Sequence, residues 1–267
     1  MNSKSILFLL SFSLLVTACN KSSLRTQPGN STSLDLNNGL VAYYPFNGNA
    51  DDASGDGYDA VVSGATLAAN RFGDSSEAYE FNGLTAYLRY EDILDEIFCA
   101  PVAKFSVCGW AKVRSTGSSY YGGGFIIGKN AGGTVGPYQW SVSYVDGQVV
   151  AQVFFDTAAA NYVTLTSPMA TNRWFHFVLV FDGSLAPSQR LALYVDGQSF
   201  NDSPLRVVGA VGVTTVNSQQ HLAIGATHYA NTPQSPEDFF NGFIDDIRIY
   251  DRPLSQAEVQ ALYLETE

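Results

Sequence analysis

The sequence predicts an all-β protein, an antiparallel sandwich of the jelly-roll type with one short C-terminal helix. Short aromatic and β-branched segments fill almost the whole chain after the N-terminal region. Gly, Asn, Asp and Ser separate these segments at regular intervals, as turns separate strands. One stretch near the C-terminus instead carries apolar residues at helical spacing. This combination is typical of a sandwich or jelly roll and not of alternating strands and helices.

The N-terminal residues 1–19 have the pattern of a secretory signal. Lys4 precedes an apolar run from Ile6 to Val16, which is too short to span a membrane. The run ends in VTAC, which resembles a bacterial lipobox, and this resemblance makes Cys19 the lipidated N-terminus of the mature protein. The alternative is an ordinary signal peptide with a chance cysteine. We therefore expect a lipoprotein of the cell envelope, anchored in the membrane only through its lipid, with the leaflet undetermined.

The rest of the chain divides into a linker and one domain. Residues 20–38 are polar and rich in Ser, Asn and Thr, which predicts a flexible tether. Residues 39–267 contain no second low-complexity break, and single all-β domains commonly reach this size. A domain of this length buries enough apolar surface to fold alone.

The charge balance is acidic, with 25 Asp plus Glu against 14 Lys plus Arg and a net charge of −11. Such a surface repels nucleic acids and anionic lipids. The composition therefore favours neutral ligands or cations as partners.

The expected strands follow one another along the domain and end before the helix. Asp146-Gly147 and Asp196-Gly197 each follow Tyr-Val and predict hairpin turns. The helix follows Pro253, with Ser255 as its cap and Glu258 three residues later. The predicted strands are 40–46, 78–83, 86–90, 105–113, 124–129, 138–145, 148–155, 162–166, 174–183, 190–197, 221–226 and 243–250.

Two cysteines remain once Cys19 carries a lipid. Cys99 and Cys108 bracket the segment APVAKFSV. A disulfide is permitted outside the cytoplasm, but sequence does not show whether the two Cα atoms come within reach. A disulfide and a pair of buried free thiols are both open.

The order of four stretches resembles the LamG-like jelly-roll domains of bacterial secreted proteins, in the concanavalin A-like lectin/glucanase superfamily. The resemblance spans almost the whole domain. One departure is Asp59-Ala60, where members often have Asn-Gly. The stretches are GLVAYYPFNGNADDASGDGYDAVVSGAT (39–66), FSVCGWAKV (105–113), RWFHFVLVFDGS with LALYVDGQ (173–198), and FNGFIDDIRIYDRPLSQAEVQALY (240–263).

The resemblance implies a calcium ion that joins an early acidic turn, NADDASGDGYD (49–59), to an aspartate on the last strand. Carried over, Asp52 and Asp245 supply carboxylates and Gly57 supplies a carbonyl. Ca²⁺ prefers such oxygen ligands. The turn is no EF-hand, because Ser63 stands at the twelfth position and no helices flank it. The alternative is that Asp52 and Asp245 are solvated turn residues.

Strand alternation supports the calcium interpretation for Asp245. In FIDDIRIY, Asp245 shares a face with Phe243, Ile247 and Ile249, whereas Asp246 lies beside Arg248 on the other. A carboxylate among apolar residues needs a partner.

Carbohydrate binding is the function that the resemblance and the aromatic residues favour. Sugar recognition uses exposed aromatic rings with a few fixed polar groups. Packing inside the sandwich is the alternative for each ring. A further alternative is an adhesive module that binds a surface protein through an exposed apolar patch. The candidates are Tyr120, Tyr121, Tyr138, Trp140, His228 and Tyr229.

Glycoside hydrolysis is the second alternative, since glucanases share the superfamily. Laminarinase-type glucanases carry their carboxylates as E-x-D-x-x-E on one strand. The nearest run here, EDILDE, places Glu91 and Glu96 five residues apart, so a strand points them to opposite faces. This run predicts a polar loop or a short helical turn. We therefore expect a lipid-anchored, calcium-stabilised, non-catalytic module that binds a glycan.

Overall fold

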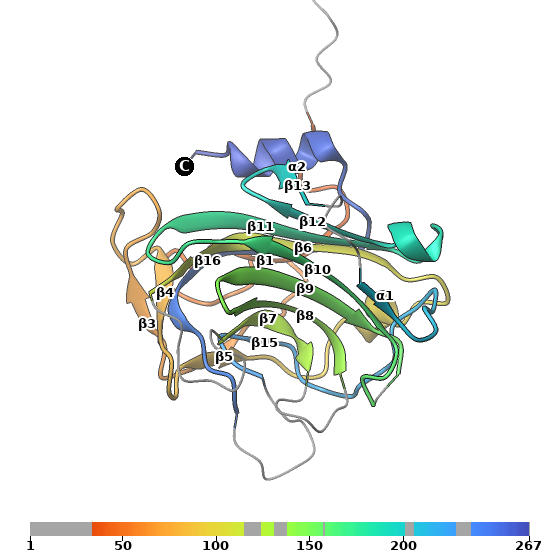
Figure 1. Ribbon diagram of the computed structural model, residues 1–267. Helices are drawn as coiled ribbons and strands as arrows, with labels where there is room; N and C mark the ends of the chain where they lie inside the picture. Colours follow the sequence, from red (N-terminus) through yellow and green to blue (C-terminus); the bar gives the residue numbers. More distant parts are fainter. Residues whose placement is uncertain are drawn as a thin grey trace, which may run out of the picture. The chain divides into compact units, whose positions relative to one another are not determined.

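The computed structural model describes residues 34–114, 124–130, 138–156, 158–200, 206–227 and 236–266. The described chain forms a compact unit that begins at Leu34, a few residues before the predicted boundary at Gly39. It is a sandwich of two antiparallel eight-stranded sheets with a short C-terminal helix, which confirms the predicted fold (Figure 1). Among the described residues, no helix has the length and apolar character needed to cross a bilayer.

Sheet A contains the first and last strands of the domain. Strand β1 pairs with β16, away from the main path of the sheet. The order along the path is β13 (Gln198–Ser199), β12 (Leu191–Val195), β11 (Trp174–Asp182), β6 (Lys104–Val113), β16 (Asn241–Tyr250), β4 (Ala78–Asn82) and β3 (Thr66–Ala68), with β1 at Leu40–Tyr44.

Sheet B lies against the inner face of sheet A and is built mostly from the middle of the chain (Figure 1). Its order is β14 (Arg206–Val208), β10 (Tyr162–Pro168), β9 (Gln148–Phe154), β8 (Tyr138–Val145), β7 (Gly124–Asn130), β15 (Ala223–Ile224), β5 (Tyr87–Arg89) and β2 (Val61–Ser63). The helical elements of the described chain are α1 (Asp95–Phe98), the 3-10 turn η1 (Pro187–Gln189) and α2 (Gln256–Tyr263).

The main core fills the space between the two sheets. Trp140 of β8 is the largest fully buried side chain among the described residues and packs against Phe98 and Phe105, with ring centroids 5.0 and 5.9 Å away. Aromatic pairs at such distances add about 0.5–1.5 kcal/mol each beyond the area they bury. The polar run around α1 is a short helical turn, as the sequence predicts.

Helix α2 covers part of the outer face of sheet A and forms a second apolar cluster there (Figure 1). Val259 and Leu262 of the helix pack with Cys108 and Tyr250 of the sheet. Ser255 and Glu258 form a capping box, in which each side chain accepts from the other residue's backbone N–H. The predicted helix and its cap are therefore confirmed.

The two predicted hairpin turns are present. Asp146 and Gly147 have φ of 47° and 80°, and Asp196 and Gly197 have φ of 49° and 73°. Positive φ at both central residues is the signature of a type I′ turn, which matches the twist of the flanking strands. The first turn joins β8 to β9, and the second joins β12 to β13.

The face assignment predicted for the last strand is wrong, because β16 contains a β-bulge. From Asp245 to Arg248 the strand β16 advances by three residues, whereas its partner β6 advances by only two. Asp246, inside this stretch, has φ of 49°. One extra residue reverses the alternation beyond it. Ile247 therefore points into the core, while Asp245 pairs with Trp110 on the outer face.

The possible disulfide between Cys99 and Cys108 is not present. Both cysteines are free thiols. Cys108 belongs to the outer cluster beneath α2, whereas Cys99 packs against the main core between the sheets. A layer of sheet A separates the two positions, so the open alternative of two free thiols holds.

Candidate functional site

A pocket of about 310 Å³ opens on the outer face of sheet B. Strands β8, β9 and β10 form its floor. The described residues that line it are Gly124, Phe125, Asn130, Tyr138, Ser141, Ser143, Val145, Gln152, Phe154, Ala159, Tyr162, Thr227 and Asp238. We call this pocket the sheet B groove.

Strand alternation places polar side chains on the floor of the groove. In β8, Val142 and Tyr144 point into the core, so Ser141 and Ser143 point outward. In β9, Val153 faces the core and its neighbours face the groove. The two sheet faces thus separate an apolar core from a polar floor.

Three aromatic rings form a continuous strip in the groove. The rings of Tyr138 and Phe154 have centroids 5.1 Å apart and planes 29° apart. Phe154 and Tyr162 follow at 5.6 Å and 39°. Tyr138 and Tyr162 are partly exposed, whereas Phe154 is nearly buried between them. Arg206 of β14 lies over the Tyr162 ring at 5.9 Å.

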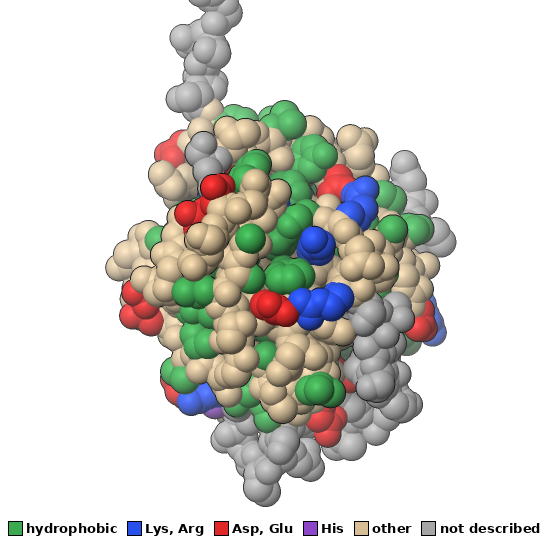
Figure 2. Space-filling view, turned by 90° about the vertical axis from the view of Figure 1, so that its left-hand side faces the viewer, with side chains coloured by type: hydrophobic (Ala, Val, Ile, Leu, Met, Phe, Trp, Pro, Cys, Tyr) green, Lys and Arg blue, Asp and Glu red, His purple; other side chains and the backbone are tan. Residues whose placement is uncertain are grey.

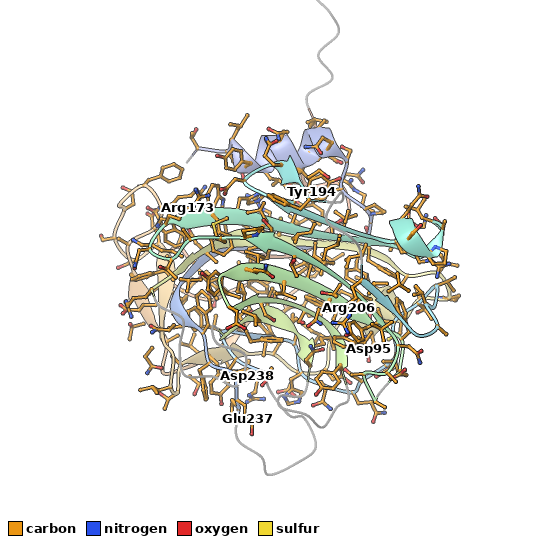
Figure 3. All side chains as sticks on the ribbon, viewed as in Figure 1. Asp95, Arg173, Tyr194, Arg206, Glu237 and Asp238 are labelled. Carbon is orange, nitrogen blue, oxygen red and sulfur yellow. The ribbon has the colours of Figure 1, made fainter. Side chains whose placement is uncertain are left out.

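The charge in the groove is low. Asp238 is the one ionisable acid or base, other than tyrosine, among the described lining residues, and Figure 3 shows it beside Glu237. Its backbone carbonyl accepts from the N–H of Phe125, near the start of β7. Ser143 and Gln152 are partly exposed on the floor. Hydroxyl and amide groups next to aromatic rings suit a polyhydroxylated ligand without charge.

A buried polar network lies behind one end of the groove. Lys129 is fully buried, and its Nζ donates to Asp92 Oδ1 and Asp95 Oδ1 at 2.6 Å and to the carbonyl of Ile93 at 2.8 Å. The next residue, Asn130, lines the groove and accepts from the backbone N–H of Gln139 at 2.8 Å. A buried ammonium with three acceptors fixes the segment that ends in Asn130.

The aromatic residues predicted from the sequence to bind a ligand do not all line the groove. Tyr138 lines the groove. Trp140 has no exposed surface and cannot contact a ligand in solution, so its assignment as a binding residue is wrong. The four other candidates, Tyr120, Tyr121, His228 and Tyr229, lie outside the described residues, as does Cys19.

Sequence reasoning missed Phe154 and Tyr162. Both belong to predicted strands, and both have the opposite parity to core residues of the same strand, Val153 and Val163. This parity could have identified the two rings as outward-facing, because the neighbours of a core residue on a strand face away from the core.

Asp52 organises the early acidic turn through hydrogen bonds to its own chain. Its Oδ1 accepts from the backbone N–H groups of Tyr43 and Ser54, both at 2.9 Å. Its Oδ2 accepts from Ser54 Oγ at 2.8 Å and from the N–H groups of Gly57 and Tyr58 at 3.1 Å. Burial raises the pKa of Asp52, but these hydrogen bonds outweigh it and lower the pKa below its usual value.

Arg71, from the loop between β3 and β4, contacts Asp245 from above sheet A. Its Nη1 lies 3.2 Å from Asp245 Oδ2 and 2.5 Å from Asp246 Oδ2, and its side chain is only 6 % exposed. The guanidinium also stacks over Trp110 at 4.7 Å and over Phe72 at 4.4 Å. We call this arrangement the Arg71 clasp.

The described residues do not fit a calcium ion shared by Asp52 and Asp245. Donor hydrogens point at both oxygens of Asp52, and the Arg71 guanidinium already stands beside Asp245. Within the described ranges, no three carboxylate, cysteine or histidine side chains gather as a metal site would require. Calcium binding, with Gly57 as a carbonyl ligand, stays a prediction.

The two antiparallel sheets have the architecture of a jelly roll. Residues 82–260 match the laminin G family described as the concanavalin A-like lectin/glucanases superfamily, and the chain belongs to this family. No curated protein sequence matches the chain significantly.

Several solved structures share the fold at low sequence identity. The binding domain of Paraclostridial Mosquitocidal Protein 1 is 18% identical over 86% of this chain and 52% of its own, with a TM-score of 0.59. The binding domain of Botulinum Neurotoxin DC, solved in complex with SialylT, is 14% identical over 86% and 52%, with a TM-score of 0.57. This chain therefore spans about half the length of these toxin binding domains.

A third similar structure is matched over almost its whole length. Domain 4 of AbnA, a GH43 extracellular arabinanase from Geobacillus stearothermophilus, was solved in complex with arabinotriose. It is 18% identical over 84% of this chain and 98% of its own, with a TM-score of 0.55. At these identities the likeness is one of fold.

Proposed function

We propose that this protein is a carbohydrate-binding module that holds an uncharged glycan in the sheet B groove. The observation that carries the proposal is the strip formed by Tyr138, Phe154 and Tyr162 beside Ser143 and Gln152. The apolar C–H face of a sugar ring packs on an aromatic ring, and its hydroxyl groups bond to nearby polar side chains.

The charge of the groove argues for neutral sugars. No Lys or Arg is among the described lining residues, and Asp238 adds negative charge. Arg206 lies over the Tyr162 ring at the β10 side of the groove, so the floor itself offers no basic partner to a carboxylated or sulfated sugar.

The comparisons support a binding role. Domain 4 of AbnA was solved with arabinotriose, and a toxin binding domain was solved with SialylT. At such low sequence identity these structures share the fold with this chain but do not indicate which sugar it binds, so the sugar must be found by experiment.

A non-catalytic role is part of the proposal. Glycoside hydrolases act with two carboxylates across the scissile bond, about 5–9.5 Å apart. The described lining of the groove offers one, Asp238. Glu91 lies before the helical turn α1 and Glu96 lies on it. Both are exposed, and neither is among the described residues that line the groove.

The proposal also places the module at the cell envelope. The VTAC pattern supports lipidation at Cys19, and residues 20–38 would give the domain reach from the membrane. Labelling cells with a radioactive fatty acid tests this point: the wild-type protein should carry label, and Cys19→Ser should not.

The decisive experiment is a glycan array followed by titration calorimetry with the strongest neutral oligosaccharide, arabinotriose included among the probes. Tyr162→Ala should lower affinity about tenfold, which is about 1.4 kcal/mol. Tyr194→Ala, on β12 of the other sheet (Figure 3), is the matched control and should bind like the wild type.

Two outcomes would contradict the proposal. One is an array without any neutral ligand, combined with capture of a specific surface protein, which would favour the adhesive alternative. The other is equal affinity of the wild type and Tyr162→Ala for a glycan that does bind.

A further inference from the structure

A row of alternating aromatic and charged side chains crosses the outer face of sheet A. Directly paired residues on adjacent strands project to the same face. Trp174 of β11 pairs with Lys112 of β6, Lys112 pairs with Phe243 of β16, and Phe243 pairs with Glu80 of β4. We call these four residues the outer ladder.

The rings and cations of the outer ladder contact one another. Lys112 Nζ lies 5.6 Å from the centre of the Phe243 ring, and the guanidinium of Arg114 lies 4.9 Å from it. Trp174 approaches the same ring at 6.2 Å. All four of these side chains keep some exposure to solvent, so the ladder is a surface and not a core.

Counted together with its neighbours Arg114, Arg173 and Asp196, the outer ladder carries one more positive than negative charge. Arg114 pairs with Glu80, and Arg173, just before Trp174, pairs with Asp196. Lys112 has no carboxylate within ion-pair distance in the described part of the chain, so three basic residues face two acidic ones. Figure 2, which views the side that lies on the left in Figure 1, shows Lys and Arg side chains beside acidic and hydrophobic ones. A local excess of positive charge is unusual in a protein with a net charge of −11.

We propose that the outer ladder is a second binding site, for a carboxylated sugar such as a uronic acid. The pyranose face would pack on Trp174, and the carboxylate would lie against the ammonium of Lys112. This preference is opposite to that of the sheet B groove, so the two sheets would hold two kinds of sugar.

The position of the ladder favours a sugar over an acidic peptide. Peptides commonly bind by adding a strand at a sheet edge or by filling an apolar groove. Strands β11, β6, β16 and β4 all lie inside sheet A, where neighbouring strands pair with both edges. A sugar ring needs only an aromatic face and a nearby cation.

The test uses two forms of one polymer, polygalacturonate and its fully methyl-esterified derivative, titrated into the purified protein in the presence of a chelator. We expect the acid form to bind and the ester to bind at least fivefold more weakly. Lys112→Met keeps the apolar stem and removes the charge. It should weaken binding of the acid about fivefold, and raising the salt concentration should weaken wild-type binding in the same way.

Matched variants separate this site from the groove. Lys104→Met, at the opposite end of β6, removes a charge from the same strand and should change nothing. Tyr162→Ala should weaken binding of neutral glycans and leave polygalacturonate binding intact, so either proposal can fail alone.

Three results would overturn the inference. Lys112→Met and Trp174→Ala could both bind polygalacturonate like the wild type. The ester could bind as tightly as the acid. Polyglutamate could bind as tightly as polygalacturonate, which would make the ladder a site for acidic peptides.

Discussion

Replacing Arg71 with Met tests whether the Arg71 clasp holds the last strand in place. Methionine keeps most of the length of the side chain but removes the guanidinium. Asp245 is only 1 % exposed, so it would be left as a buried carboxylate without the Arg71 guanidinium. We expect a large loss of stability with the groove left intact.

The magnitude follows from the burial of the pair. Removing one member of a buried ion pair costs about 3–5 kcal/mol, because the remaining charge loses its compensation. The two ring contacts, to Trp110 and Phe72, bring the expected loss toward the upper end of that range. For a domain of this size, each kcal/mol lowers Tm by about 2–4 °C, which gives a drop of about 6–20 °C.

The assay is chemical unfolding at pH 7, followed by fluorescence, with a matched exposed pair as the control. Arg89 and Glu91 form an ion pair whose side chains are 30 % and 73 % exposed. Because exposed pairs contribute about 0–1 kcal/mol, Arg89→Met should unfold almost like the wild type.

A double variant separates the charge from the loss of packing. Asp245→Asn in the Arg71→Met background removes the charge that has lost the guanidinium and should restore part of the lost stability. The clasp interpretation is wrong if Arg71→Met costs no more than Arg89→Met, or if Asp245→Asn makes the double variant still less stable.

Three further outcomes are expected. If Arg71 and not a metal ion neutralises Asp245, Tm should be equal in calcium and in chelator. A calcium site at Asp245 would instead raise the free energy of unfolding by about 2.7 kcal/mol at a hundredfold excess of calcium over Kd, and Asp245→Asn would abolish that gain. Burial lowers the pKa of His176 to about 3, with Arg248 and Arg71 adding to the shift. In the unfolded chain His176 binds a proton below about pH 6.5, whereas in the folded protein it stays neutral down to about pH 3. The free energy of unfolding should therefore fall by up to about 1.4 kcal/mol per pH unit between pH 6.5 and pH 3, and His176→Phe should lack this slope. Burial raises the pKa of the Cys108 thiol to about 12, so alkylation without reductant should spare it in the folded protein and modify both Cys99 and Cys108 after unfolding; a disulfide would block both.

The strands, hairpins and helix were predictable because their signals are local. Alternation along a strand, Asp-Gly turns, and the Ser255–Glu258 capping box each depend on residues a few positions apart. The jelly-roll class follows from the number and spacing of such segments.

The bulge at Asp246 could not be placed from sequence, because it depends on the pairing of β16 with β6. A left-handed conformation is one that Asp tolerates better than most residues, so the Asp-Asp pair was compatible with it but did not specify it. The partner of Asp245 lies 174 residues away at Arg71, and strand periodicity carries no information about such a contact.

The groove was predictable in part. Trp140 has the parity of Val142 and Tyr144, so alternation alone argues for its burial. Tyr138 has the same parity but lines the groove, because the pairing of β7 with β8 is irregular between Lys129 and Asn130. Irregular registers of this kind arise from tertiary pairing and not from the local pattern.

Mapping a bound neutral oligosaccharide onto the protein tests the central claim most directly. Backbone NMR spectra would be recorded as the strongest neutral ligand from the array is added to the protein. The sheet B groove predicts that the largest shift changes fall on the amides of Ser143, Gln152, Phe154 and Tyr162, and that Tyr162→Ala weakens them. Changes confined to the outer face of sheet A, or equal changes in the wild type and Tyr162→Ala, would contradict it.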